Sequence, residues 1–113
     1  MHELSLMEGL LELIQDSARK EGFTRVRRVI LSIGKLSGVE PEAMAFCFES
    51  VMAGTLAEGA ELEINEVEGL GRCEPCGATV PMETRFDPCP HCGKVQLPVT
   101  AGTDMRVEAL DVV

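Results

Sequence analysis

Hydrophobic residues near the N-terminus recur at intervals of three and four positions. This spacing predicts an amphipathic helix over residues 3–21, because one face of a helix collects such positions. We expect the helix to end at Gly22, since glycine commonly follows the last helical turn. The apolar stripe consists of Leu4, Met7, Leu10, Leu11, Ile14 and Ala18.

The pattern then changes to alternation. Residues 24–33 are rich in β-branched side chains, and Val29, Leu31 and Ile33 alternate with charged or small neighbours. Such alternation predicts a strand that ends at Gly34. A second helix is expected after Val39, with Pro41 in its first turn and a break near Gly54.

Two later segments, 61–67 and 105–113, again have strand texture. Between them, from residue 69 to residue 103, short segments are interrupted by Gly, Pro and Cys, and few large apolar residues are available to form a core. We therefore expect an α+β fold of two helices packed on a small three-stranded sheet. The predicted domain comprises residues 1–68 completed by a C-terminal strand at 104–113, and residues 69–103 form an insert that needs a metal to fold.

Four of the five cysteines form two C-x-x-C pairs, separated by twelve residues: Cys73, Cys76, Cys89 and Cys92. Two residues between thiolates allow one tight turn to aim both sulfurs at a common point, and two such turns complete a tetrahedral shell. Gly77 and Gly93, which directly follow each pair, suit the positive φ of such a turn. The pattern predicts a zinc ribbon with structural Zn(II), because four protein ligands leave no position for a catalytic water.

Other interpretations of the cysteines remain. Four thiolates also suit an iron–sulfur cluster. A thioredoxin-like redox motif at Cys73–Cys76 would explain only half of the pattern and lacks a βαβ context. The fifth cysteine, Cys47, lies among apolar residues and is expected to be a buried small hydrophobe rather than a ligand.

Charge and composition narrow the class of function. The chain has 113 residues, a formal net charge of −9, four Phe, and neither Tyr nor Trp. An acidic surface with few aromatic rings disfavours nucleic acid as a partner, and the predicted insert holds only three basic residues against three acidic ones. No stretch is apolar enough to cross a membrane, and Glu3 and Glu8 stand where a signal peptide would carry basic residues, so we expect a cytoplasmic protein.

The first residues, Met1-His2-Glu3, have a chemistry of their own. The α-amine of Met1, the amide nitrogen of His2 and its Nδ1 can form adjacent five- and six-membered chelate rings around one cation. Three nitrogens in a plane favour Ni(II) or Cu(II). Taken alone, a histidine at this position is more often a solvated residue at a frayed terminus.

The whole chain resembles the HypA/HybF family of nickel metallochaperones for [NiFe]-hydrogenase maturation. The similarity is carried by Met1-His2-Glu3-Leu4-Ser5-Leu6, Ile33-Gly34-Lys35-Leu36-Ser37, Phe46-Cys47-Phe48-Glu49, Cys89-Pro90-His91-Cys92 and Gly102 before the last strand. The resemblance implies Ni(II) as transported cargo at Met1, His2 and Glu3, and Zn(II) at the four paired cysteines. It also implies delivery with the HypB GTPase to the hydrogenase large subunit.

Several alternatives stay open beside this resemblance. Glu40 is a further nickel ligand to consider, His91 is expected to be an exposed loop residue, and some family members also serve urease. We expect a monomer or weak dimer without enzymatic activity, since no catalytic triad, P-loop or three-ligand zinc signature occurs. The main rival function is a protein-interaction scaffold that holds zinc without carrying nickel.

Overall fold

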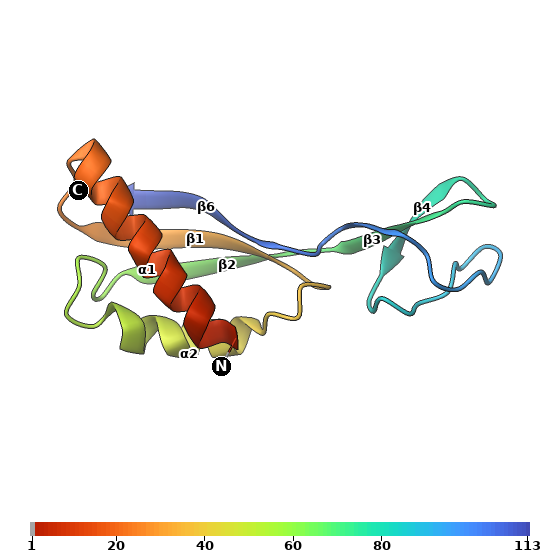
Figure 1. Cartoon of the computed structure of the whole chain (residues 1–113), viewed down its shortest axis with the longest axis horizontal. Helices are drawn as coiled ribbons and strands as arrows, with labels where there is room; N and C mark the ends of the chain where they lie inside the picture. Colours follow the sequence, from red (N-terminus) through yellow and green to blue (C-terminus); the bar gives the residue numbers. More distant parts are fainter. Residues whose placement is uncertain (1) are drawn as a thin grey trace. The chain divides into compact units, whose positions relative to one another are not determined.

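The computed structural model describes residues 2–113 (Figure 1), so Met1 lies outside the described residues. The two predicted helices and the three predicted strands are present, and three further short strands lie between residues 69 and 101. The elements are α1 (His2–Glu21), β1 (Val26–Gly34), α2 (Pro41–Met52), β2 (Glu61–Val67), β3 (Gly69–Cys73), β4 (Ala78–Met82), β5 (Val99–Ala101) and β6 (Met105–Val112). The predicted α+β class is confirmed.

The chain divides into two compact units. The helical unit comprises the residues up to Leu31 together with Val39–Ile64 and Val107–Val113, and the ribbon unit comprises Ser32–Gly38 and Asn65–Arg106. The ribbon unit is thus wider than the segment 69–103 that the sequence suggested. It gains the end of β1 because backbone N–H groups there donate to the returning chain, from Gly34 to the Asp104 carbonyl and from Leu36 to the Gly102 carbonyl.

The helical unit places α1 and α2 against each other, with α1 crossing one face of the sheet (Figure 1). The strand order is β2-β1-β6, so β1 is central. The core of the helical unit is made by the apolar stripe of α1 and the inward residues of β1 and α2: Met7, Leu10, Ile14, Val26, Val29, Leu31, Met44, Phe48 and Met52. As predicted, α1 ends at Gly22, which has a φ of 80° and donates to the Ala18 carbonyl at 2.8 Å.

The ribbon unit contains a second three-stranded sheet, of order β4-β3-β5, in which β3 pairs antiparallel with both neighbours. Glycine permits a close approach of chains here. A Cβ on Gly69 would lie 2.6 Å from both the Leu36 side chain and the Met82 carbonyl oxygen. This sheet carries Cys73 at the end of β3.

Candidate metal centre

The four paired cysteines converge in the ribbon unit. One ligand atom from each of Cys73, Cys76, Cys89 and Cys92 lies within 4.8 Å of the others, and the Cys73 and Cys92 sulfurs are 3.4 Å apart. A tetrahedral zinc centre with bonds of about 2.3 Å separates its sulfurs by about 3.8 Å, so the cluster has the dimensions of such a shell. Among residues 2–113, no other group of three or more potential ligands comes together in this way.

Two equivalent turns aim the sulfurs. The N–H of Gly77 donates to the Cys73 carbonyl at 2.7 Å, and the N–H of Gly93 donates to the Cys89 carbonyl at 2.8 Å. Both glycines adopt the positive φ expected from the sequence, 69° and 77°. The positive φ lets the chain turn back after each pair, which a residue with a Cβ does less readily.

The electrostatic environment of the sulfurs is unequal. Burial of Cys89 disfavours its thiolate, yet the N–H groups of His91 and Cys92 donate to its sulfur, and the pKa of Cys89 falls to about 6. The neighbouring thiols of Cys92 and Cys73 have the opposite effect on Cys76 and raise its pKa to about 12. Four thiolates this close repel one another, so a cation of charge two or more is what allows all four to ionise.

An apolar core supports one side of the cluster. Cys73 and Cys89 are buried in it, whereas Cys76 and Cys92 are exposed. The core comprises Leu36, Val80, Met82 and Leu97 together with the two buried cysteines. The site is therefore held from one side by packing and is open to solvent on the other, and its donor set fits a soft or borderline metal with four sulfur ligands.

The residues expected to hold nickel lie at the start of α1, except for Met1, which is outside the described residues. His2 is exposed and Glu3 is half-buried. The backbone N–H of Glu40 donates to Oε2 of Glu3 at 3.3 Å. The N–H of Glu3 itself and, to a smaller extent, the N–H of Glu40 lower the pKa of the Glu3 carboxyl.

Two further residues from the sequence analysis have different outcomes. His91 is exposed, as expected for a loop histidine. Cys47 is outside the cysteine cluster, but it is only half-buried on α2, not fully buried as predicted. The helix turns Met44, Phe48 and Met52 toward the core, and Cys47 falls at the edge of that face.

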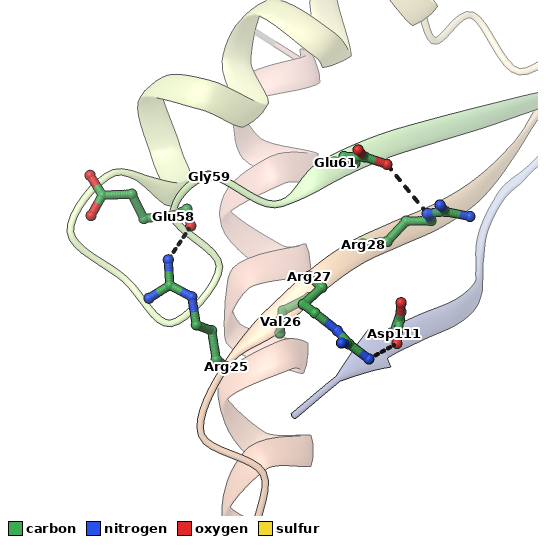
Figure 2. A pocket seen from close by; sticks show the side chains of 8 residues that line it. All are labelled: Arg25, Val26, Arg27, Arg28, Glu58, Gly59, Glu61 and Asp111. Atoms are coloured by element: carbon green, nitrogen blue, oxygen red, sulfur yellow. Dashed lines mark hydrogen bonds and ion pairs between the residues drawn. The ribbon is translucent and has the colours of Figure 1, made fainter.

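A pocket of about 390 Å³ on the helical unit was not anticipated (Figure 2). It gathers three arginines from the chain before and within β1, and each has an acceptor: Arg25 donates to the Glu58 carbonyl at 3.2 Å, Arg27 pairs with Asp111 at 3.0 Å and Arg28 pairs with Glu61 at 3.5 Å. Only the short distance between Arg25, Arg27 and Arg28 in the sequence could have suggested it. The acceptors belong to the same unit, so these three contacts link β1 and the residue before it to β6, to β2 and to the loop before β2.

Among the described residues, no helix is both long enough and apolar enough to span a bilayer.

Comparison with known proteins gives concordant matches. A family model described as "Hydrogenase/urease nickel incorporation, metallochaperone, hypA" matches residues 1–112. The chain is 55% identical over 112 residues to the hydrogenase maturation factor HypA of Albidiferax ferrireducens and 52% identical over 112 residues to that of Dechloromonas aromatica, with 99% of each chain covered in both cases.

Solved structures agree in fold. The solution structure of the Ni metallochaperone HypA from Helicobacter pylori aligns with a TM-score of 0.70 at 23% identity, covering 98% of this chain and 97% of that one. A structure titled "Solution structure of HypA protein" aligns with a TM-score of 0.69 at 26% identity, covering 100% and 97%.

Proposed function

This chain belongs to the HypA family of nickel-incorporation metallochaperones, and from this premise we propose that it binds Ni(II) at its N-terminus and delivers it to a [NiFe]-hydrogenase. The observation that carries the proposal is the sequence Met1-His2-Glu3 in a chain of this family, with His2 exposed at the start of α1. Structural Zn(II) is proposed at Cys73, Cys76, Cys89 and Cys92.

The chemistry of a helix start supports nickel binding there. The first N–H groups of a helix have no acceptor within the helix, so a metal can displace the amide proton of His2 without breaking a helical hydrogen bond. The amine of Met1 and Nδ1 of His2 complete the in-plane nitrogens. The helix dipole opposes a cation at this end, and the carboxylate of Glu3 offsets that repulsion.

The division of labour between the two sites follows from their ligands. Four thiolates form a complete shell that retains zinc and stabilises the ribbon unit. An incomplete chelate at an exposed terminus leaves a position for a ligand from another protein, as a donor requires. The HypB GTPase and the hydrogenase large subunit are the proposed partners, and the chain acts as a monomer or weak dimer in the cytoplasm, without catalysing a reaction.

Hydrogenase is proposed as the destination rather than urease. The family description names both, whereas the relatives from Albidiferax ferrireducens and Dechloromonas aromatica are called hydrogenase maturation factors. Glu40 is a further ligand to test, because its backbone holds the Glu3 carboxylate beside the proposed nickel site.

Metal analysis of the untagged protein tests the proposal against the rival scaffold function. After nickel exposure and desalting, we expect one zinc and one nickel per chain. Mixing with a nickel-free large-subunit precursor should then move nickel, and not zinc, to the precursor. Stoichiometric zinc without any bound nickel would favour the scaffold and contradict a chaperone.

A further inference from the structure

The motif Phe46-Cys47-Phe48-Glu49 is used by neither metal site. It lies on α2, where Phe48 packs inward and is 6% exposed, whereas Phe46 is 79% exposed. Met44, Phe48 and Met52 mark the inward face, so Phe46, two residues from Phe48, lies on the opposite side of the helix. A phenylalanine this exposed on a well-formed helix contributes nothing to the core.

A groove begins at Glu49, which lies three residues after Phe46 and is therefore its neighbour on the surface of α2. It has a volume of about 500 Å³ and runs between α2 and the loop before β2. Its apolar lining includes Ala45 and two core residues, Phe48 and Met52, which are only 6% and 1% exposed, and the opposite wall is Glu58–Ala60. Hydrogen bonds order the chain that leads from α2 to this wall: Thr55 Oγ1 donates to the Met52 carbonyl at 2.7 Å, and Ala60 N–H donates to the Ala57 carbonyl at 3.1 Å.

The charged side chains that line the groove are acidic. Glu49 and Glu58 line it, Glu42 lies one turn before Phe46, and α2 contains no Lys, Arg or His. Arg25 lines the adjoining pocket of Figure 2 and donates to the Glu58 carbonyl at 3.2 Å, so a basic group borders the groove at its Glu58 wall, and the acidic character belongs to the α2 side. An apolar surface with an acidic rim complements a segment that carries an apolar side chain flanked by Lys or Arg.

The position of the surface relates it to the proposed nickel site. The start of α1 lies beside the start of α2, where Glu40 N–H donates to Glu3 (Figure 1). Six residues of helix separate Glu40 from Phe46, about 9 Å at 1.5 Å per residue. A protein docked on this face is therefore within reach of a metal held at the N-terminus.

We propose that Phe46, Glu49 and the adjoining groove form the docking surface for the nickel acceptor, the hydrogenase large-subunit precursor, through a basic segment with an apolar anchor. This inference rests on the proposed function, since it concerns the protein that receives the nickel. A second copy of this chain is a poorer occupant, because two chains of formal charge −9 repel each other.

The experiment measures binding of the nickel-loaded full chain to the purified precursor by surface plasmon resonance. Phe46→Ala should weaken binding about tenfold or more, as truncation of a buried aromatic anchor does. Glu49→Lys should slow association, with the larger effect at low salt. Phe86→Ala is the matched control, because Phe86 is equally exposed, at 81%, but belongs to the ribbon unit. Glu12→Lys, at an exposed position of α1, is the charge control.

Nickel affinity and zinc content should be the same in all four variants, which separates docking from metal binding and from folding. The proposal is overturned if Phe46→Ala binds the precursor like the unaltered protein, or if Phe86→Ala weakens binding equally. It is also overturned if Phe46→Ala converts a dimer to a monomer in sedimentation, since the face would then belong to a second copy. If the unaltered chain binds nickel but not the precursor, this inference fails while nickel binding stands; if it binds no nickel, the proposed function fails first.

Discussion

The two units of this chain obtain their cores in different ways. The helical unit buries large apolar side chains from two helices and the central strand, among them Met7, Ile14, Leu31 and Met44. The ribbon unit has one small cluster of six buried residues, and two of those are Cys73 and Cys89. In the ribbon unit two of the four proposed metal ligands are thus part of the core itself, and packing alone is a small source of stability there.

The same contrast separates the two proposed metal sites. The proposed ribbon site joins positions up to nineteen residues apart, and a metal bound there would complete a shell, so folding and metal binding would be one event. The N-terminal site uses neighbouring residues at the end of a helix that is stable by its own packing. Metal can leave it without unfolding anything, and this difference suits one site to retention and the other to delivery.

The largest expected effect comes from removing one sulfur. Cys92→Ala should unfold the ribbon unit, because zinc binding supplies on the order of 10 kcal/mol to small sites of this kind. We expect zinc content to fall and proteolysis to cut within residues 69–103, while the helical unit stays resistant. Cys47→Ala, outside the cluster, is the control. If Cys92→Ala keeps stoichiometric zinc and residues 69–103 stay resistant to proteolysis, the proposed four-cysteine zinc site is refuted.

Removing the proposed nickel ligand should have a large effect confined to the other unit. His2→Ala, or one residue added before Met1, should abolish specific nickel binding and leave zinc and folding unchanged. The extension turns the amine into an amide, so unaltered affinity in the extended protein would show that the amine is not a ligand. Calorimetry measures both variants.

Nickel binding should also depend on pH, because an amine and an amide must lose protons to bind the metal. From about pH 7.5 to about 6, nickel affinity should fall more than tenfold. Zinc should largely remain. Titrations in buffers of different ionisation enthalpy should show more than one proton released per nickel, and a count near zero would point to carboxylates such as Glu3 instead.

An intermediate effect on the stability of the ribbon unit is expected from substituting Leu36, which follows β1 in the chain and packs in the core of the ribbon unit. Leu36 is 7% exposed and packs in the cluster with the buried cysteines, and its carbonyl accepts a bond from Arg85 at 3.0 Å. Leu36→Ala should cost about 2–5 kcal/mol of ribbon stability and accelerate zinc loss to a chelator. Val95→Ala, at a position 57% exposed in the same unit, should leave the rate unchanged. Equal rates in the two variants would mean that Leu36 does not protect the site.

The smallest effect concerns Glu3. Its pKa is lowered because backbone N–H groups, its own and that of Glu40, bind the ionised carboxylate. A lowered folded pKa means that the stabilisation is complete above the ordinary pKa of glutamate and is lost as pH falls through the folded value. Thermal melting of the protein and of Glu3→Gln should therefore differ slightly at pH 7 and converge toward pH 3. A gap that widens on acidification would contradict this sign.

Local patterns were sufficient for much of this protein. The helices follow from a stripe of apolar residues with glycine at the end of α1, and the cysteine cluster follows from two C-x-x-C turns whose glycines adopt positive φ. These features depend on residues a few positions apart, where the geometry of a turn or a helix decides which side chains meet.

Contacts between distant residues required the folded chain. Periodicity did not reveal that Leu36 belongs to the ribbon core, that Glu40 holds Glu3, or that Phe46 faces outward while Phe48 faces inward. The sequence pattern also predicted a buried Cys47, which is half-buried, and it did not indicate that Arg27 pairs with Asp111. Each of these contacts depends on which elements pack together. The residues next to an apolar or charged position in the sequence do not identify the distant segment that will cover or neutralise it.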